Sequence, residues 1–96
     1  MSIYEKAIEH FGVHKQINKA IEEMAELTTE LARYQNGTAM NVNIIDEIAD
    51  VSIMMTQLGI IFGRDLVDNK TQVKLERLEL RMSNTARINP PKCGAV

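Results

Sequence analysis

The sequence predicts an all-α fold, and three observations support that prediction. Aromatic residues make up 4% of the 96-residue chain and Trp is absent, so aliphatic residues and six Met must build the core. Such a composition favours packed helices over a β-sandwich or barrel. Apolar residues also recur every three or four positions, and short breaker sequences separate these stretches. We expect a four-helix bundle completed by association of several copies, because a short chain buries a modest fraction of its surface.

The first two helices should be separated by a glycine. We expect a short helix over residues 2–11, with Ser2 as its N-cap candidate and Gly12 as its end. A long helix over residues 14–34 should follow, because its apolar residues repeat with a helical period. These residues are Val13, Ile17, Ala20, Met24, Leu27 and Leu31. The sequence Gln35-Asn36-Gly37 is a strong helix breaker and should end this helix.

The third helix should run over residues 44–62, with Asn43 as its N-cap. Its apolar residues nearly encircle it, which is typical of a buried helix. They are Ile44, Ile45, Ile48, Ala49, Val51, Ile53, Met55, Leu58, Ile60 and Phe62. A narrow polar strip remains, formed by Asp46, Glu47, Asp50 and Gln57. The pattern therefore predicts a central helix with its acids along one wet edge.

A fourth helix should cover residues 66–82, after the short connection Gly63-Arg64-Asp65. We expect residues 1–82 to form one domain, since 96 residues are too few for two. Residues 83–96 contain Pro90-Pro91 and show no helical period, so they should form a mobile tail or an arm that packs on a partner subunit.

Charge and cysteine content narrow the function classes. The formal net charge is −2, which argues against coating DNA or RNA. Cys93 is the only cysteine, so no disulfide forms within the chain and a reducing cytoplasm is the expected compartment. No apolar run is long enough to cross a membrane, and the N-terminus lacks a signal-peptide pattern. We expect a soluble cytoplasmic protein that binds neither a nucleic-acid polymer nor a membrane.

Two acidic pairs carry the strongest functional signal. Glu23-x-x-Glu26 and Glu47-x-x-Asp50 each place two carboxylates one helical turn apart, beside an apolar stripe. Carboxylates close to a core are costly unless a positive charge accompanies them. Four acids from two helices suit Mg²⁺ or Mn²⁺. A neighbouring Lys or Arg that offsets the repulsion without any metal is the open alternative.

A basic row on the fourth helix is the second signal. Lys70, Lys74, Arg77 and Arg81 follow one another at steps of four, three and four, which places them on one face. Such a row repels itself and suits a polyanion such as a triphosphate. A solvated face, or pairing with the acidic helices inside the fold, are the alternatives. Gln16 on the second helix is a further candidate for contact with a base or sugar.

With both acidic pairs placed on helices, the chain resembles the MazG-like, all-α nucleoside triphosphate pyrophosphohydrolases. That superfamily is marked by Glu-x-x-Glu on one helix and Glu-x-x-Asp on the next long helix. The matching stretches here are residues 22–27, EEMAEL, and residues 46–51, DEIADV. Phe11-Gly12, Gln16 and the later Lys74-x-x-Arg77-Leu78-x-x-Arg81 are also similar to short relatives of bacteria and phages. The resemblance covers about residues 5–82 and is poor at fixing the substrate.

The resemblance implies that Glu23, Glu26, Glu47 and Asp50 coordinate Mg²⁺ on a triphosphate. It implies cleavage between the α- and β-phosphates, which yields a nucleoside monophosphate and pyrophosphate. Glu22 or one of the four acids would accept the proton of the attacking water. Lys74, Arg77 and Arg81 would stabilise the leaving pyrophosphate, and Gln16 would contact the substrate. The helical relatives are dimers or tetramers, so a homo-oligomer that acts in house-cleaning or nucleotide-pool balancing is expected.

Two departures from the family pattern bear on the substrate. No Trp is present to stack a base, as in some relatives, so base recognition stays open. The phosphoribosyl-ATP pyrophosphohydrolases of the same superfamily typically carry Tyr-His soon after the second motif, where this chain reads Val51-Ser52-Ile53. That activity ranks lower as an alternative. The alternative from a different class is a non-catalytic helical interaction module in which acids and bases simply pair.

Overall fold

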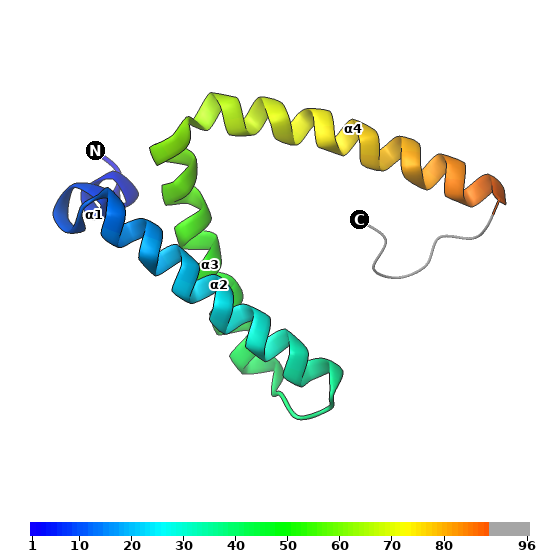
Figure 1. Ribbon diagram of the computed structural model, residues 1–96, viewed down its shortest axis with the longest axis horizontal. Coiled ribbons are helices and arrows are strands. Elements are labelled where there is room, and N and C mark those ends of the chain that lie inside the picture. The colour runs from blue at the N-terminus through cyan, green and yellow to red at the C-terminus, as the bar shows by residue number, and fades with distance from the viewer. Residues whose placement is uncertain (89–96) are drawn as a thin grey trace. The chain divides into compact units, whose positions relative to one another are not determined.

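The computed structural model describes residues 1–88, and their side chains through residue 84. These residues form four helices and no strand, which confirms the predicted all-α class (Figure 1). The helices are α1 (Ile3–Phe11), α2 (Val13–Gln35), α3 (Asn41–Phe62) and α4 (Arg64–Ile88). The chain divides into two units, of which the first is Met1–Phe62 and the second begins at Gly63. No described helix is long and apolar enough to cross a membrane.

Local chemistry sets both ends of α1. The Ser2 hydroxyl accepts a hydrogen bond from the Glu5 backbone N–H at 3.2 Å, and the Glu5 carboxylate accepts one from the Ser2 N–H at 3.0 Å. This reciprocal pair is a capping box, so the predicted N-cap is confirmed. At the other end, Gly12 adopts a φ of +93°, a conformation that glycine reaches without a Cβ penalty. Its N–H donates to the Ile8 carbonyl at 2.8 Å, and α2 begins at the next residue.

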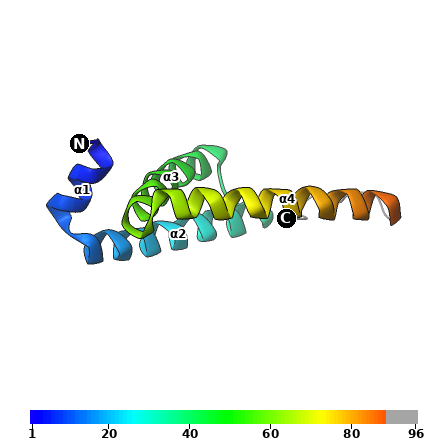
Figure 2. The same cartoon turned by 90° about the horizontal axis from the view of Figure 1, so that it is seen from above.

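An antiparallel pair of long helices, α2 and α3, forms the centre of the first unit, and α1 packs against both (Figures 1 and 2). The predicted breaker ends α2, and Gly37 takes a φ of +74° in the turn. The prediction that Asn43 caps α3 was wrong, because the helix already begins at Asn41. The Asn43 N–H donates to the Met40 carbonyl at 3.1 Å, so this residue lies in the first turn of the helix.

Burial on α3 is lower than its apolar pattern predicts. Met54, Gln57 and Gly59 are its only buried residues, whereas Ile45 is 63% exposed and Met55 is 51% exposed. Packing against α1 and α2 covers one side of α3, and a unit of 62 residues has too little chain to cover the others. The expectation of a buried central helix is therefore not met within one copy of the chain.

The fourth helix is longer than predicted. It extends to Ile88, six residues past the expected end at residue 82. No Gly or Pro interrupts the sequence between Met82 and Pro90, so the helix continues without apolar periodicity. The predicted tail at residues 83–96 therefore begins as helix, and its remainder, residues 89–96, lies outside the described residues.

Candidate metal centre

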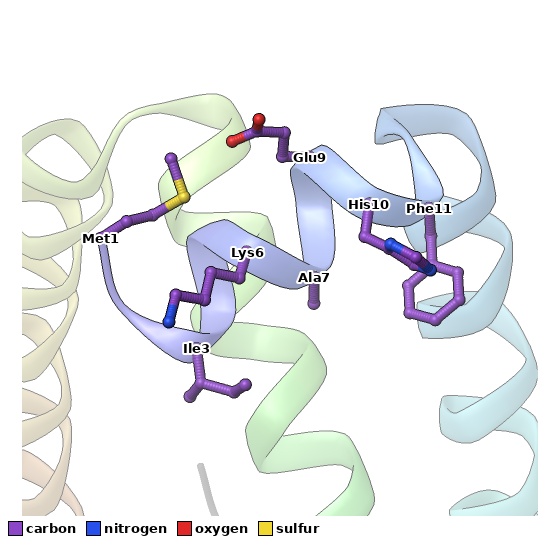
Figure 3. A pocket seen from close by; sticks show the side chains of 7 residues that line it. All are labelled: Met1, Ile3, Lys6, Ala7, Glu9, His10 and Phe11. Atoms are coloured by element: carbon purple, nitrogen blue, oxygen red, sulfur yellow. The ribbon is translucent and has the colours of Figure 1, made fainter.

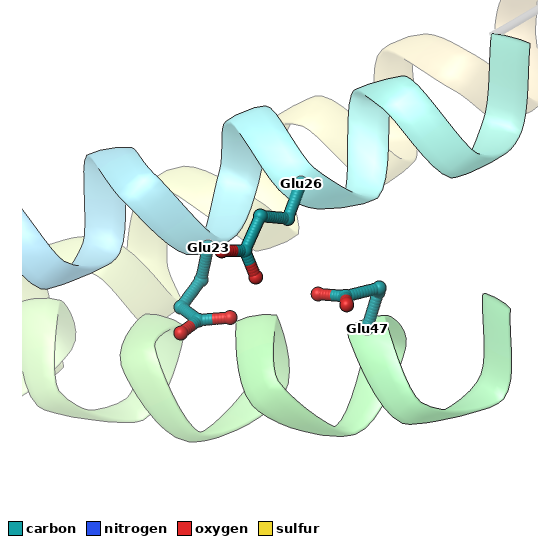
Figure 4. A group of neighbouring side chains, drawn as sticks. All are labelled: Glu23, Glu26 and Glu47. Carbon is teal, nitrogen blue, oxygen red and sulfur yellow. The ribbon is translucent and has the colours of Figure 1, made fainter. Parts of the chain in front are cut away.

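Three glutamates from two helices converge within the first unit. Glu23 and Glu26 lie one turn apart on α2, and Glu47 lies on α3. One carboxylate oxygen of each residue lies within 4.8 Å of those of the other two. Figure 4 shows the three carboxylates facing one another between the helices. The antiparallel pairing of α2 and α3 thus brings together three of the four predicted metal ligands.

The fourth predicted ligand, Asp50, is outside this group. It lies one turn after Glu47 on α3, and its side chain is exposed. Glu22, the predicted proton acceptor, is also outside the group and is exposed. It is nevertheless close enough to Glu26 to influence the charge of that residue.

Burial sets this cluster apart from surface acids. Glu23 is only 6% exposed, and Glu47 is half-buried. The Oε2 atoms of both residues are buried and lack a hydrogen-bond partner. A buried polar atom without a partner costs stability, and a charged one costs more. Glu23 and Glu47 therefore each have an oxygen that is available to a metal ion.

One cation partly compensates these charges. Lys19 lies one turn before Glu23 on α2, and its Nζ is 3.0 Å from Glu23 Oε1 and 3.9 Å from Glu22 Oε1. The hydrogen bond to Glu23 and the charge of Glu22 raise the pKa of the Lys19 ammonium. Lys19 is therefore a neighbouring cation of the kind that was expected from the sequence as the alternative to a metal. The spacing of four residues could have identified it.

A single lysine leaves negative charge uncompensated. Repulsion from the Glu23 carboxylate is the largest of several effects that raise the pKa of Glu26 above its ordinary value of 4.5. Loss of hydration and the charge of Glu47 act in the same direction. The negative charge of its neighbours therefore makes ionisation of Glu26 less favourable. A divalent cation would relieve this repulsion.

The cluster's dimensions suit a small divalent ion. A single Mg²⁺ holds oxygen ligands at about 2.1 Å, so two ligands on opposite sides of the ion lie about 4.2 Å apart. The three carboxylate oxygens all lie within 4.8 Å of one another, which is compatible with this spacing. The donor set consists of carboxylate oxygens alone, which Mg²⁺, Mn²⁺ and Ca²⁺ prefer over nitrogen or sulfur.

A cavity of about 490 Å³ adjoins the acid cluster. Gln16, a predicted substrate contact, lines it and is 7% exposed. Gln57 lines it from α3 and is 3% exposed, although the sequence placed this residue on a wet edge. The helical period places Gln57 on the polar strip of α3, but in the fold residues of α1 and α2 lie around it. The amino-acid pattern contains no signal for this burial.

The predicted phosphate-binding residues lie in the second unit. Lys74, Arg77 and Arg81 line one shallow hollow along α4, which confirms that they share a helix face. All three side chains are exposed.

A larger hollow lies elsewhere in the first unit. It has a volume of about 820 Å³ and is lined by α1 together with Met1 (Figure 3). Figure 3 shows Glu9 pointing away from Ile3 and Lys6, so the polar groups do not converge on one point. The His10 and Phe11 rings meet edge to face, with centroids 4.7 Å apart. This surface lacks the arrangement that a reaction requires, despite its size.

Comparison of the chain with protein-family models, with curated proteins and with solved structures gave no significant match.

Proposed function

We propose that the first unit binds Mg²⁺ through Glu23, Glu26 and Glu47 and that the protein hydrolyses nucleoside triphosphates. The products are a nucleoside monophosphate and pyrophosphate. The observation that carries this proposal is the convergence of three carboxylates beside Lys19, two of which, Glu23 and Glu47, have a buried oxygen without a hydrogen-bond partner. Mn²⁺ is a second metal that the same oxygen ligands accept.

The reaction transfers a nucleotidyl group to water. A water oxygen attacks the α-phosphorus, and the bond from that phosphorus to the oxygen bridging it to the β-phosphate breaks. The metal supplies charge neutralisation at the phosphate oxygens and lowers the pKa of water in the site. Glu22 accepts the proton of the attacking water, because it lies beside the cluster and outside the three metal-facing carboxylates.

Other residues bind or position the substrate. Asp50 lies one turn from Glu47 and would be the fourth carboxylate to hold the metal. Lys74, Arg77 and Arg81 share one face of α4 in the second unit, and their role in stabilising the leaving pyrophosphate stays a prediction. Gln16 contacts the nucleoside from the cavity beside the acids.

The biological role that fits this chemistry is the removal of aberrant or excess (d)NTPs in the cytoplasm. We further propose that the chain acts as a homodimer or homotetramer. Ile48, Met55 and Phe62 follow one another at steps of seven on α3 and are 48%, 51% and 63% exposed. Such a row on one helix face is suited to pairing with another helix.

A non-catalytic interaction module is the second candidate function. The ion pair between Lys19 and Glu23 favours it, because a lysine at 3.0 Å compensates part of the acidic charge without a metal. In this alternative the acids pair with basic residues and bind no metal.

A pyrophosphate-release screen over common and damaged (d)NTPs separates the two candidates. We expect release from at least one triphosphate with Mg²⁺, and none in the presence of a chelator. Glu47→Gln should lower kcat/KM by about 100-fold or more, because it removes a metal ligand, and even groups that only orient a ligand are worth about 10–100-fold. Glu9→Gln is the matched control, since Glu9 is exposed on α1 and outside the cluster.

Calorimetry provides a second readout that does not depend on finding the substrate. We expect Mg²⁺ or Mn²⁺ to bind in the presence of an α,β-methylene nucleotide, and Glu47→Gln to abolish that binding. Absence of both metal binding and pyrophosphate release, with folding intact, would overturn the proposed hydrolysis and favour the interaction module.

A further inference from the structure

The cavity beside the acid cluster is lined by both apolar and polar side chains. Residues from α1, α2 and α3 line its volume of about 490 Å³, which lies within the range of small-molecule sites. Its lining includes Phe11, Gln16, Lys19, Glu22, Met54 and Gln57. The lining thus combines a phenyl ring and a thioether with polar side chains, which include the amides of Gln16, Asn18 and Gln57.

Gln57 is the unexplained residue in this cavity. It is 3% exposed, and its Oε1 atom is buried without a hydrogen-bond partner. A buried amide without a partner is destabilising, whereas an apolar residue of the same shape is not. Gln16 places a second buried amide in the same cavity from α2. Two amides on neighbouring helices therefore surround a space that lacks a hydrogen-bonding partner for Gln57.

Lys19 and Glu22 connect the cavity to the acid cluster. Lys19 lines the cavity, and its Nζ is 3.0 Å from Glu23 in the cluster. Glu22 also lines the cavity and is the residue before Glu23. A ligand whose neutral end occupies the cavity therefore has its other end beside the carboxylates. A nucleotide has this layout, with a flat base at one end and anionic phosphates at the other.

We propose that this cavity binds the nucleobase of the substrate and that Gln57 is the residue that determines base specificity. The proposal rests on the metal-dependent hydrolysis described above. An amide presents a donor and an acceptor side by side, which complements the adjacent donor and acceptor on a base edge. Rotation about the terminal side-chain torsion, which is broad in glutamine, presents the Gln57 amide to the base. Met54 and Phe11 cover the apolar faces of the ring.

The test is the substitution Gln57→Leu, which keeps a similar volume and removes the amide. Because Gln57 Oε1 accepts no hydrogen bond, this variant should fold at least as well as the parent protein. We expect kcat/KM for the preferred dNTP to fall about tenfold or more, and the preference among the four bases to shrink by a similar factor. Hydrolysis of inorganic tripolyphosphate, which has no base, should be unchanged.

Gln35→Leu is the matched control, because Gln35 is an exposed glutamine at the end of α2. It should leave both substrates unaffected. An unchanged base preference in Gln57→Leu would overturn the proposal, as would an equal loss on dNTP and tripolyphosphate.

A binding experiment separates failure of this proposal from failure of the hydrolytic function. The side-chain amide signals of Gln57, assigned by their loss in Gln57→Leu, are followed by NMR without metal during titration with the four deoxynucleosides. Shifts produced by at least one deoxynucleoside and absent with ribose 5-phosphate would support base binding, even if no triphosphate is hydrolysed. Binding of metal and triphosphate at the acids without any nucleoside-induced shift would overturn base recognition and leave the hydrolytic function standing.

Discussion

The α2–α3 pair and α4 each carry a row of like charge, but the two rows lie in different surroundings. On the α2–α3 pair, Glu23 is buried and Glu47 is half-buried, and each has an oxygen without a partner. On α4, every described side chain over residues 64–84 is exposed except Leu78, which is half-buried. Water and salt screen repulsion along an exposed row, whereas a row close to a core repels more strongly. Burial, more than the number of charges, separates the candidate centre from a charged helix face.

Two ion pairs, one in each unit, differ in the same way. Lys19–Glu23 and Arg64–Asp68 both join residues four apart, and both have an N–O distance of 3.0 Å. The Glu23 side chain is 8% exposed, whereas that of Asp68 is 62% exposed. Equal geometry therefore has unequal consequences, since a carboxylate that is already hydrated gains little from a partner.

Glu26→Gln should produce the largest effect. We expect it to lower activity and to raise the stability of the metal-free protein. We expect pyrophosphate release to fall about 100-fold or more, since a metal ligand is lost. The metal-free protein should become more stable at pH 7, because the substitution removes the repulsion that raises the pKa of Glu26. Thermal unfolding in a chelator and steady-state kinetics measure the two changes.

The pH dependence of this stability gain has a defined sign. A folded state that raises the pKa of a carboxyl binds the proton more tightly than the unfolded state. That contribution to stability is fully present below the ordinary value of 4.5 and is lost as pH rises through the raised pKa. The gain from Glu26→Gln should therefore be larger at pH 7 than at pH 4.5. A gain that is equal at both pH values would show that Glu22, Glu23 and Glu47 exert no net repulsion on Glu26.

Lys19→Met should have an intermediate effect that depends on the metal. Without metal, we expect the free energy of unfolding to fall, because the buried Glu23 carboxylate loses its partner. With Mg²⁺ the loss should disappear, and the metal affinity should rise several-fold because a competing cation is gone. Chemical denaturation with and without Mg²⁺ provides the measurement. An identical loss in both conditions would favour the interaction module.

Arg64→Met should have the smallest effect and serves as the matched control for Lys19→Met. Both partners of its ion pair are exposed, so we expect a change within about 0.5 kcal/mol in the free energy of unfolding. The change should be independent of Mg²⁺. A loss as large as that of Lys19→Met would indicate that burial does not distinguish the two pairs.

Most of the helical organisation could be predicted because its signals are local. The capping box at Ser2 and the glycines at positions 12 and 37 act through neighbouring backbone groups, so the first two helices end where expected. Asn43 misled the prediction because asparagine is favoured as a cap but also fits the first turn. Glu23, Glu26 and Glu47 were identified because their spacing on two neighbouring helices brings them together when those helices pair.

The amino-acid sequence alone determines the helix periods, the helix breakers and the placement of each acidic pair on one face of its helix. These features depend on contacts within a few residues. The burial of Gln57, the choice of Glu47 over Asp50 in the cluster and the incomplete covering of α3 depend on how separate helices pack. The local pattern can place a side chain on a face of its helix. Whether that face meets another helix or water depends on contacts between residues far apart in the chain, and this difference separates a buried carboxylate from a solvated one.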